Sequence, residues 1–217
     1  MEYGPELNNF LFEAAMDRLL VIASDRYGAR CLLRCLESSK ATLYQKKLVA
    51  TSIVLNSIPL ATNSNGALLL TWMLGSSNLR GRYDLISKRF LPHLSHLCNH
   101  RIPSCSILRI IGQSSEPGAS KSILKRMFLS KKYDCVLKGL LLDSPTGLQF
   151  IGKILAFSTI SPGDGLEIEE AIRTTLSTMT VNYTPEHHAL KEDPFPTSIL
   201  HERTPSATGK TLVVANQ

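Results

Sequence analysis

The feature that most constrains the fold of this 217-residue chain is a segment that recurs four times with the same plan. Each copy opens with a polar turn and a small residue and then continues into an apolar helical stretch. The small residues are separated by 38, 38 and 43 positions, and they are Gly28, Gly66, Ser104 and Gly147. Recurrence at this period is typical of solenoids, because one such unit cannot bury its apolar stripe alone and must stack on its neighbours.

Helical periodicity surrounds the four copies, since apolar residues recur three and four positions apart and strand-like alternation is scarce. The copies cover residues 25–37, 63–74, 101–112 and 144–155. An apolar helical stretch precedes each copy, and a basic amphipathic stretch follows the first three, at 44–54, 83–90 and 120–127. The pattern predicts an all-α superhelix of about four units with three helices each, in which one helix of every unit lines the inner face.

The chain divides into three expected parts. Residues 1–15 are an N-terminal extension, and residues 16–180 are the helical array, which closes with a capping helix near its C-terminal end. Residues 181–217 are expected to be a flexible tail, because prolines there lie among Ser, Thr and His with little apolar periodicity.

Basic residues are concentrated within the array. Between Arg18 and Lys153, 20 Lys or Arg residues stand against six acidic residues, a surplus of 14, whereas the whole chain has a net charge of only +6. Such a surplus favours a polyanionic partner, because each Lys or Arg that faces a phosphate releases condensed counterions; the alternative is a solvated basic surface. We expect the basic side chains to gather along the inner curve of the array.

The cysteines and histidines give little support to a metal site. The five cysteines lie in apolar segments without paired spacing, which predicts buried thiols and neither disulfides nor zinc ligands. His93, His96 and His100 share one face of an expected first helix, but no nearby acid completes a hydrolytic site. We therefore expect neither a metal nor a cofactor.

No signal for catalysis or for membrane insertion stands out. The ATGKT segment at 207–211 lacks the earlier glycine of a phosphate-binding loop, and no turn presents a nucleophile. The longest apolar runs fall far short of the roughly 20 residues that span a bilayer. The first residues are acidic and polar, where a secretory signal needs a basic and then an apolar region. We expect an intracellular binding protein that is not an enzyme.

The first copy, DRYGARCLLRCLE, resembles the second-helix signature of the Pumilio (PUF) RNA-binding repeats. The stretches ATNSNGALLLTWML and LPHLSHLCNHRIPSCSILRII are similar to a divergent fungal branch of that family. The likeness covers roughly residues 16–155 and implies a right-handed arc with single-stranded RNA along its concave side. It also implies a cytoplasmic regulator that binds the 3′ untranslated region of mRNA and acts with protein partners of mRNA decay or translation control.

The resemblance also implies which residues touch RNA. In the family, two positions of each second helix contact a base edge: the residue directly after the small turn residue, and the residue four positions further on. The residue directly after the first of these two stacks between bases. The edge pairs in this sequence are Ala29 and Leu33, Ala67 and Thr71, Cys105 and Arg109, and Leu148 and Gly152. The stacking positions are Arg30, Leu68, Ser106 and Gln149.

Family members usually carry Asn, Ser or Cys at the first edge position and Gln or Glu at the second, because these side chains match the donors and acceptors of a base. Several aliphatic residues stand at these positions here. We therefore predict partial sequence selectivity over a mainly electrostatic grip. The residues predicted to contact RNA are Arg30, Leu33, Thr71, Ser106, Arg109 and Gln149.

Two other functions fit the same pattern. A protein-binding scaffold of the HEAT or armadillo kind would use the curvature to hold a peptide, and a nucleolar relative of the family would bind ribosomal RNA by its shape. The degenerate edge positions favour the scaffold, whereas the charge surplus opposes it. Some of these residues have a structural alternative to RNA binding. Arg30 could form an ion pair with Asp25 or Asp17, and Arg109 could form a buried salt bridge or one between units. Trp72 is expected to belong to the core.

Overall fold

The computed structural model of the chain describes residues 5–130, 134–142 and 146–179, and all regular elements in these ranges are helices. None of these helices is long and apolar enough to cross a membrane. In chain order they are α1 (Pro5–Asp17), α2 (Leu19–Ser24), α3 (Arg26–Glu37), α4 (Leu43–Leu55), α5 (Ser57–Thr62), α6 (Gly66–Gly75), α7 (Arg82–Phe90), η1 (Leu91–His93), α8 (Leu94–Cys98), α9 (Arg101–Ile111), α10 (Pro117–Leu124), η2 (Lys125–Leu129), α11 (Asp134–Leu142), α12 (Thr146–Leu155) and α13 (Pro162–Thr178).

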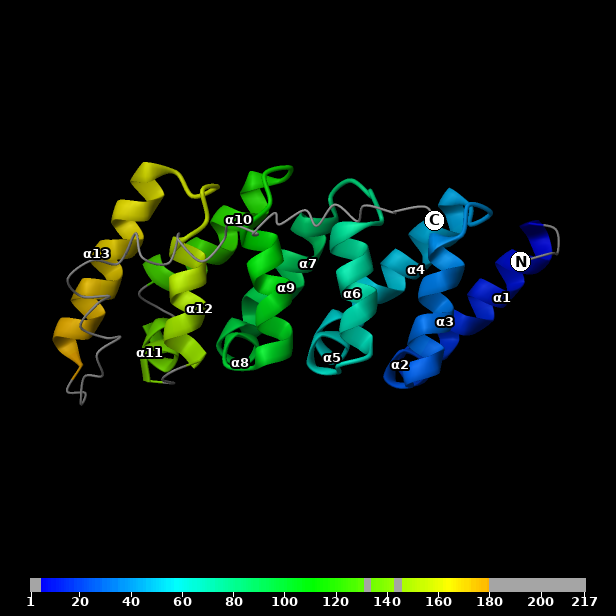
Figure 1. Cartoon of the computed structure of the whole chain (residues 1–217), viewed down its shortest axis with the longest axis horizontal. Helices are drawn as coiled ribbons and strands as arrows, with labels where there is room; N and C mark the ends of the chain where they lie inside the picture. The colour runs from blue at the N-terminus through cyan, green and yellow to red at the C-terminus, as the bar shows by residue number, and fades with distance from the viewer. Residues whose placement is uncertain (1–4, 131–133, 143–145, 180–217) are drawn as a thin grey trace, which may run out of the picture.

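The helices stack as a series of similar units (Figure 1). The second helices, α3, α6, α9 and α12, contact one another in order and form one row. A second row, which we call the outer row, consists of α1, α4, α7, α10 with η2, and α13, again in contact one after another. The short first helices α2, α5, α8 and α11 lie along one edge of the array (Figure 1). The predicted all-α superhelix of four three-helix units is confirmed.

The two ends of the array bear on the expected division of the chain. Helix α1 contacts α4, so a helix that begins within the expected N-terminal extension joins the outer row. Helix α13 occupies the place of the expected capping helix and contacts η2 and α11. The expected tail, residues 181–217, lies outside the described residues.

The small residue that opens the second helices is required by the close approach of the preceding first helix. A Cβ atom at Gly28 would lie 2.5 Å from the carbonyl oxygen of Ile22, and a Cβ at Gly147 would lie 1.9 Å from the carbonyl oxygen of Leu140. Gly66 has a similarly close backbone neighbour, at 3.0 Å. At Gly28 and Gly147 a larger residue would force the two helices apart, which explains why a small residue recurs at this position.

Side-chain caps fix where the helices of the first unit begin. Asp25 accepts hydrogen bonds from the backbone N–H groups of Tyr27 and Gly28, at 2.9 and 2.7 Å, and so caps α3. Thr42 and Gln45 form a reciprocal capping box at the start of α4. Such caps satisfy backbone donors that have no partner within the helix, and each contributes about 1 kcal/mol to stability.

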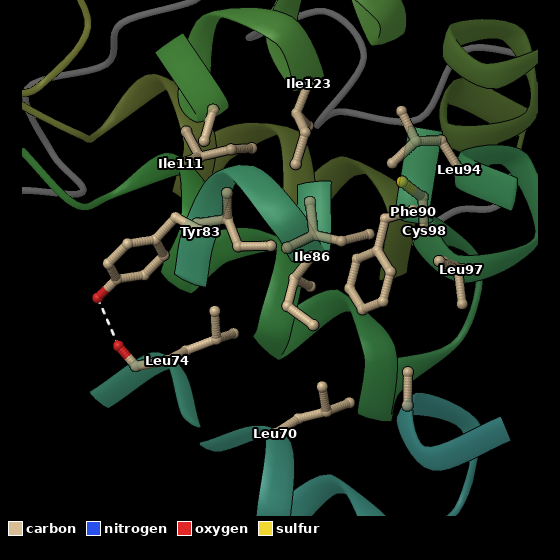
Figure 2. Packing of buried hydrophobic residues seen from close by; sticks show 14 of the residues in the cluster. Leu70, Leu74, Tyr83, Ile86, Phe90, Leu94, Leu97, Cys98, Ile111 and Ile123 are labelled. Atoms are coloured by element: carbon tan, nitrogen blue, oxygen red, sulfur yellow. Dashed lines mark hydrogen bonds between the residues drawn. The ribbon is translucent and has the colours of Figure 1, made fainter. Parts of the chain in front are cut away.

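A continuous apolar core fills the space between the two rows. Phe90 of α7 is fully buried in it, among side chains that come from several helices (Figure 2). Trp72 is 3% exposed, which confirms the prediction that it belongs to the core. Tyr83 is also buried, and its hydroxyl donates a hydrogen bond of 2.5 Å to the carbonyl oxygen of Leu74 (Figure 2). This bond satisfies the polar end of a ring that is otherwise packed against apolar groups.

The cysteines follow the prediction of buried thiols only in part. Cys98 is buried, and burial raises the pKa of its thiol to about 12. Cys31 and Cys105 are exposed, so the prediction was wrong for these two, because they lie on the solvent-exposed side of α3 and α9. Cys35 is half-buried, and the side chain of Cys135 lies outside the described part of the structure.

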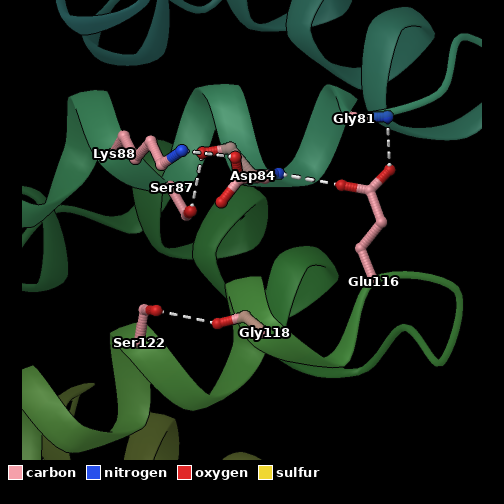
Figure 3. Close-up of polar contacts among 7 residues, drawn as sticks. All are labelled: Gly81, Asp84, Ser87, Lys88, Glu116, Gly118 and Ser122. Atoms are coloured by element: carbon pink, nitrogen blue, oxygen red, sulfur yellow. Dashed lines mark hydrogen bonds and ion pairs between the residues drawn. The ribbon is translucent and has the colours of Figure 1, made fainter.

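A half-buried turn of the outer row joins the second and third units. The Glu116 carboxylate, just before α10, accepts hydrogen bonds from the backbone N–H groups of Gly81 and Asp84, both at 2.9 Å (Figure 3). Gly81 has a φ of 76°, a conformation that glycine adopts without steric cost. Because Glu116 places a negative charge at the N-terminus of α7, it stabilises that helix and ties the units together.

Candidate nucleic-acid interface

The exposed side chains of the second helices form one surface of the array, which we call the second-helix face. The residues exposed on it include Arg26, Tyr27, Arg30, Cys31 and Arg34 of α3, Thr71 and Gly75 of α6, Arg101, Ile102, Cys105 and Arg109 of α9, and Thr146, Gln149 and Lys153 of α12. Since each helix contacts the next, equivalent residues of neighbouring units lie in line along this face.

The second helices are strongly basic. Together they hold six Lys or Arg residues and a single acidic residue, Glu37. The basic residues are Arg26, Arg30, Arg34, Arg101, Arg109 and Lys153. Helix α6 carries no charged residue, so the positive charge lies on α3 on one side of it and on α9 and α12 on the other.

The outer row holds the larger share of the positive charge. Its helices α4, α7 and α10 with η2 carry eight basic residues. The basic side chains were expected to gather along the inner curve of the array, and only some of them do. Several of these side chains serve the fold. Lys88 pairs with Asp84 at 2.7 Å, and Arg89 donates to the carbonyl oxygen of Leu55 at 3.0 Å.

Arg109 and Thr71 are both exposed, and the structure brings these two predicted residues together. Nη1 of Arg109 donates to the carbonyl oxygen of Thr71 at 3.4 Å, which joins α9 to α6. A Cβ atom at Gly75 would lie 2.6 Å from the same nitrogen, so the glycine leaves room for the guanidinium group. Arg109 therefore links the two units by a hydrogen bond to a carbonyl oxygen and not by the salt bridge that the sequence analysis considered. Sequence reasoning missed Gly75, although it stands four residues after Thr71 on the same helix face.

The first unit places Arg30 at the surface of α3 and Leu33 half within the core. Asp25, one of the two acids considered as partners for Arg30, uses its carboxylate to cap α3. Ala29 is fully buried, so this first edge position offers nothing to a base. Arg30 is accordingly the predicted residue of this unit that is available for contact.

The predicted stacking residues of the third and fourth units differ in exposure. Ser106 is 6% exposed and offers almost no surface on which a base can stack, because α9 lies between two neighbouring helices. Gln149 is exposed on α12, while Leu148 beside it is buried and Gly152 is half-buried. The fourth unit therefore presents Gln149 and Lys153 to solvent.

Two of the three histidines, His96 and His100, lie close to each other. The ring centroids of His96 and His100 are 4.6 Å apart in an edge-to-face arrangement. Among the residues that the structure describes, no group of three His, Cys, Asp or Glu side chains is placed to hold a metal ion. The edge-to-face contact accounts for the spacing of these two rings.

No family model matches the chain. Comparison with curated proteins finds the following sequence relatives. The chain is 41% identical over 153 residues to a Pumilio domain-containing protein of Schizosaccharomyces pombe, which covers 70% of this chain and 23% of that protein. It is 29% identical over 161 residues to the mRNA-binding protein PUF2 of Saccharomyces cerevisiae, which covers 71% of this chain and 15% of that protein. The chain thus spans less than a quarter of the length of either relative.

A solved structure agrees in both sequence and fold. The PUM-HD domain of S. pombe Puf1, in a crystal structure in complex with RNA, superposes with a TM-score of 0.71 and 36% sequence identity. The match covers 85% of this chain and 48% of that chain, and so takes in most of the stacked units. Because the repeated sequence pattern, the three-helix units and these similarities agree, the chain belongs to the Pumilio (PUF) family, and the relatives that it resembles are fungal proteins.

Proposed function

We propose that this chain binds single-stranded RNA along the second-helix face and has no catalytic activity of its own. The observation that carries the proposal is the charge of that face, where four helices in contact hold six basic residues and one acidic residue. Each contact between such a residue and a phosphate releases counterions and adds affinity that does not depend on sequence. The likeness to a PUM-HD domain solved in complex with RNA supports RNA as the ligand.

Selectivity for bases is proposed to be partial. The guanidinium group of Arg109 can donate to a guanine edge or to a phosphate, and that of Arg30 can stack on a base. Thr71 and Gln149 offer polar contacts at the surface. Ala29 and Leu148 are buried and aliphatic, and so cannot select a base by hydrogen bonds. The first and fourth units are therefore expected to read bases less well than the two central units.

The RNA is proposed to be messenger RNA, bound in its 3′ untranslated region in the cytoplasm. The name of one relative, an mRNA-binding protein, supports messenger RNA as the kind of RNA bound. Binding there would regulate mRNA stability or translation through recruited proteins of decay or translation control. The outer row, with its own nine basic residues once Arg173 of α13 is included, is the surface that stays accessible to such proteins when RNA occupies the second-helix face.

A labelled random-sequence RNA titrated at two salt concentrations tests the central proposal by fluorescence anisotropy. We expect binding that weakens steeply with salt, with log K falling by about 0.7 per phosphate contact for each unit of log salt concentration. Absence of binding at low salt would contradict RNA binding. It would favour a protein-binding scaffold, the second candidate, which the buried aliphatic edge positions Ala29 and Leu148 support.

A further inference from the structure

Three arginines follow one another along the exposed side of α3. Arg26, Arg30 and Arg34 are four residues apart, so they share one helix face at intervals of one turn. All three side chains are exposed, and we call them the α3 arginine stripe. Only Arg30 corresponds to a position that the family resemblance assigns to RNA, which leaves Arg26 and Arg34 without a role.

The stripe is unfavourable for the helix that carries it. Like charges four residues apart repel each other on a helix surface. Arg26 also stands in the first turn, where the helix dipole disfavours a cation and where α3 has no acidic residue. The ion pairs seen in the described residues lie in the outer row, and none of them involves the stripe. A cost of this kind without an internal partner points to an external anion.

The repeat pattern does not require arginine at these places. The residues that stand 38 and 76 positions after Arg34 are Trp72 and Ile110, and both are buried in the core. Helix α3 therefore departs from the two central units by exposing a charged side chain where they bury an apolar one. Among the described residues α3 begins the row of second helices, so no preceding second helix covers Arg34, and the sequence places a charged residue at this uncovered position.

An aromatic ring accompanies the stripe. Tyr27 is 76% exposed and lies three residues before Arg30, so the two side chains are neighbours on the helix surface. An exposed aromatic ring beside guanidinium groups is the combination on which bases of a single strand stack while the backbone is neutralised. An acidic peptide would satisfy the arginines but would leave the ring without a planar partner.

We propose that the α3 arginine stripe and Tyr27 extend the RNA-binding surface beyond the base-reading positions, with Arg26 and Arg34 binding phosphates and Tyr27 stacking on an unpaired base. Successive arginines are about 6 Å apart along the helix axis, so each can meet a different phosphate of a strand that follows α3. This inference rests on the proposed function, and it assigns to the first unit an electrostatic role in place of base reading.

Salt-dependent anisotropy with a labelled random-sequence RNA tests the two arginines that lie outside the family scheme. The double variant Arg26→Gln/Arg34→Gln should flatten the slope of log K against log salt by about 1.4, which is 0.7 for each lost phosphate contact. The variant Lys47→Gln/Lys125→Gln removes the same charge from exposed positions of the outer row and should leave the slope unchanged. Equal slopes in the two double variants would overturn the inference.

Tyr27→Ala provides an independent measurement. It should weaken RNA binding by about fivefold or more at both salt concentrations without changing the slope, because stacking releases no counterions. Thermal unfolding separates these effects from damage to the fold. The arginine double variant should unfold at the same or a higher temperature than the wild type, since repulsion within α3 is removed. A lower unfolding temperature together with an unchanged salt slope would assign the stripe a structural role and overturn the inference.

Failure of the inference and failure of the proposed function are distinguishable. If the wild type binds RNA and Arg109→Ala weakens that binding, but Arg26→Gln/Arg34→Gln keeps the full salt slope, the second-helix face binds RNA without the stripe. If the wild type binds no RNA and a polyglutamate peptide binds through Arg26 and Arg34, both proposals are overturned in favour of an acidic protein partner.

Discussion

The guanidinium group of Arg109 lies 3.4 Å from the carbonyl oxygen of Thr71, although the two residues are 38 positions apart. They occupy the same position in the third and second units, so the bond places a cation between two neighbouring second helices. A side chain that is already held in place loses less conformational freedom when a ligand binds. The bond to Thr71 therefore favours Arg109 as a contact for a ligand on the second-helix face.

Replacing Arg109 by Ala should weaken binding to RNA by at least several-fold, because it removes a cation and a donor fork from the centre of the face. The same is expected for Arg30→Ala on α3. Lys47→Ala is the matched control, since it removes an exposed charge from the outer row. Fluorescence anisotropy or filter binding measures the effect, and affinities equal to that of the wild type would refute both assignments.

Replacing Gly28 by Ala should lower the free energy of unfolding by about 1 to 3 kcal/mol, as overpacking does in a well-packed site. The new Cβ would lie 2.5 Å from the carbonyl oxygen of Ile22, and backbone atoms cannot yield as a flexible side chain can. Gly118→Ala and Gly163→Ala are controls, because a Cβ at either position meets no atom within 4 Å. Denaturant unfolding compares the three variants, and equal stability would show that the two helices of the first unit separate freely.

The buried thiol of Cys98 should make the fold less stable in alkaline solution. Its pKa rises to about 12 in the folded chain from an ordinary value near 9, so the unfolded chain loses the proton first as pH rises. The contribution of this thiol to the free energy of unfolding is therefore fully present below about pH 9. It falls by up to about 1.4 kcal/mol per pH unit between pH 9 and pH 12.

The contribution of Cys98 is isolated by comparing the wild type with Cys98→Ala over that range, since other groups titrate equally in both proteins. The stability difference between them should shrink as pH rises. A difference that stays constant from pH 8 to pH 10.5 would contradict the burial of this thiol.

The exposed thiols offer a footprint of bound RNA. Cys31 and Cys105 should react with an alkylating reagent much faster than Cys98, because they are accessible on α3 and α9. Cys105 lies one turn from Arg109 on the second-helix face, so bound RNA should slow its alkylation. Mass spectrometry of the labelled peptides measures both effects. Reaction of Cys105 at the same rate with and without saturating RNA would place the RNA elsewhere on the array.

Local order was accessible from the sequence because it depends on neighbours along the chain. Apolar stripes of helical period and a small residue every 38 to 43 positions predicted the second helices to within three residues of their observed ends. The small residue is easy to recognise in the sequence because the preceding helix approaches closely at this position. At Gly28 and Gly147 this approach leaves no room for a larger residue.

Exposure of the site residues was not accessible in the same way. Arg30, Leu68 and Ser106 occupy one position of the repeat, yet they are exposed, half-buried and buried in turn. The difference arises because α9 is covered by helices on both sides, whereas α3 begins the row of second helices. The same cause explains why Cys31 is exposed, while the residues 38 and 76 positions later, Leu69 and Ile107, are buried.

The sequence by itself determined the helices, their grouping into four units and the surplus of basic residues, because periodicity and composition are properties of the chain read in order. Only the tertiary structure decided how that charge divides between the second-helix face and the outer row, and that Arg109 meets Thr71 across two units. Which residues share a surface depends on how closely neighbouring units approach, and this distance is set by packing between residues far apart in the sequence.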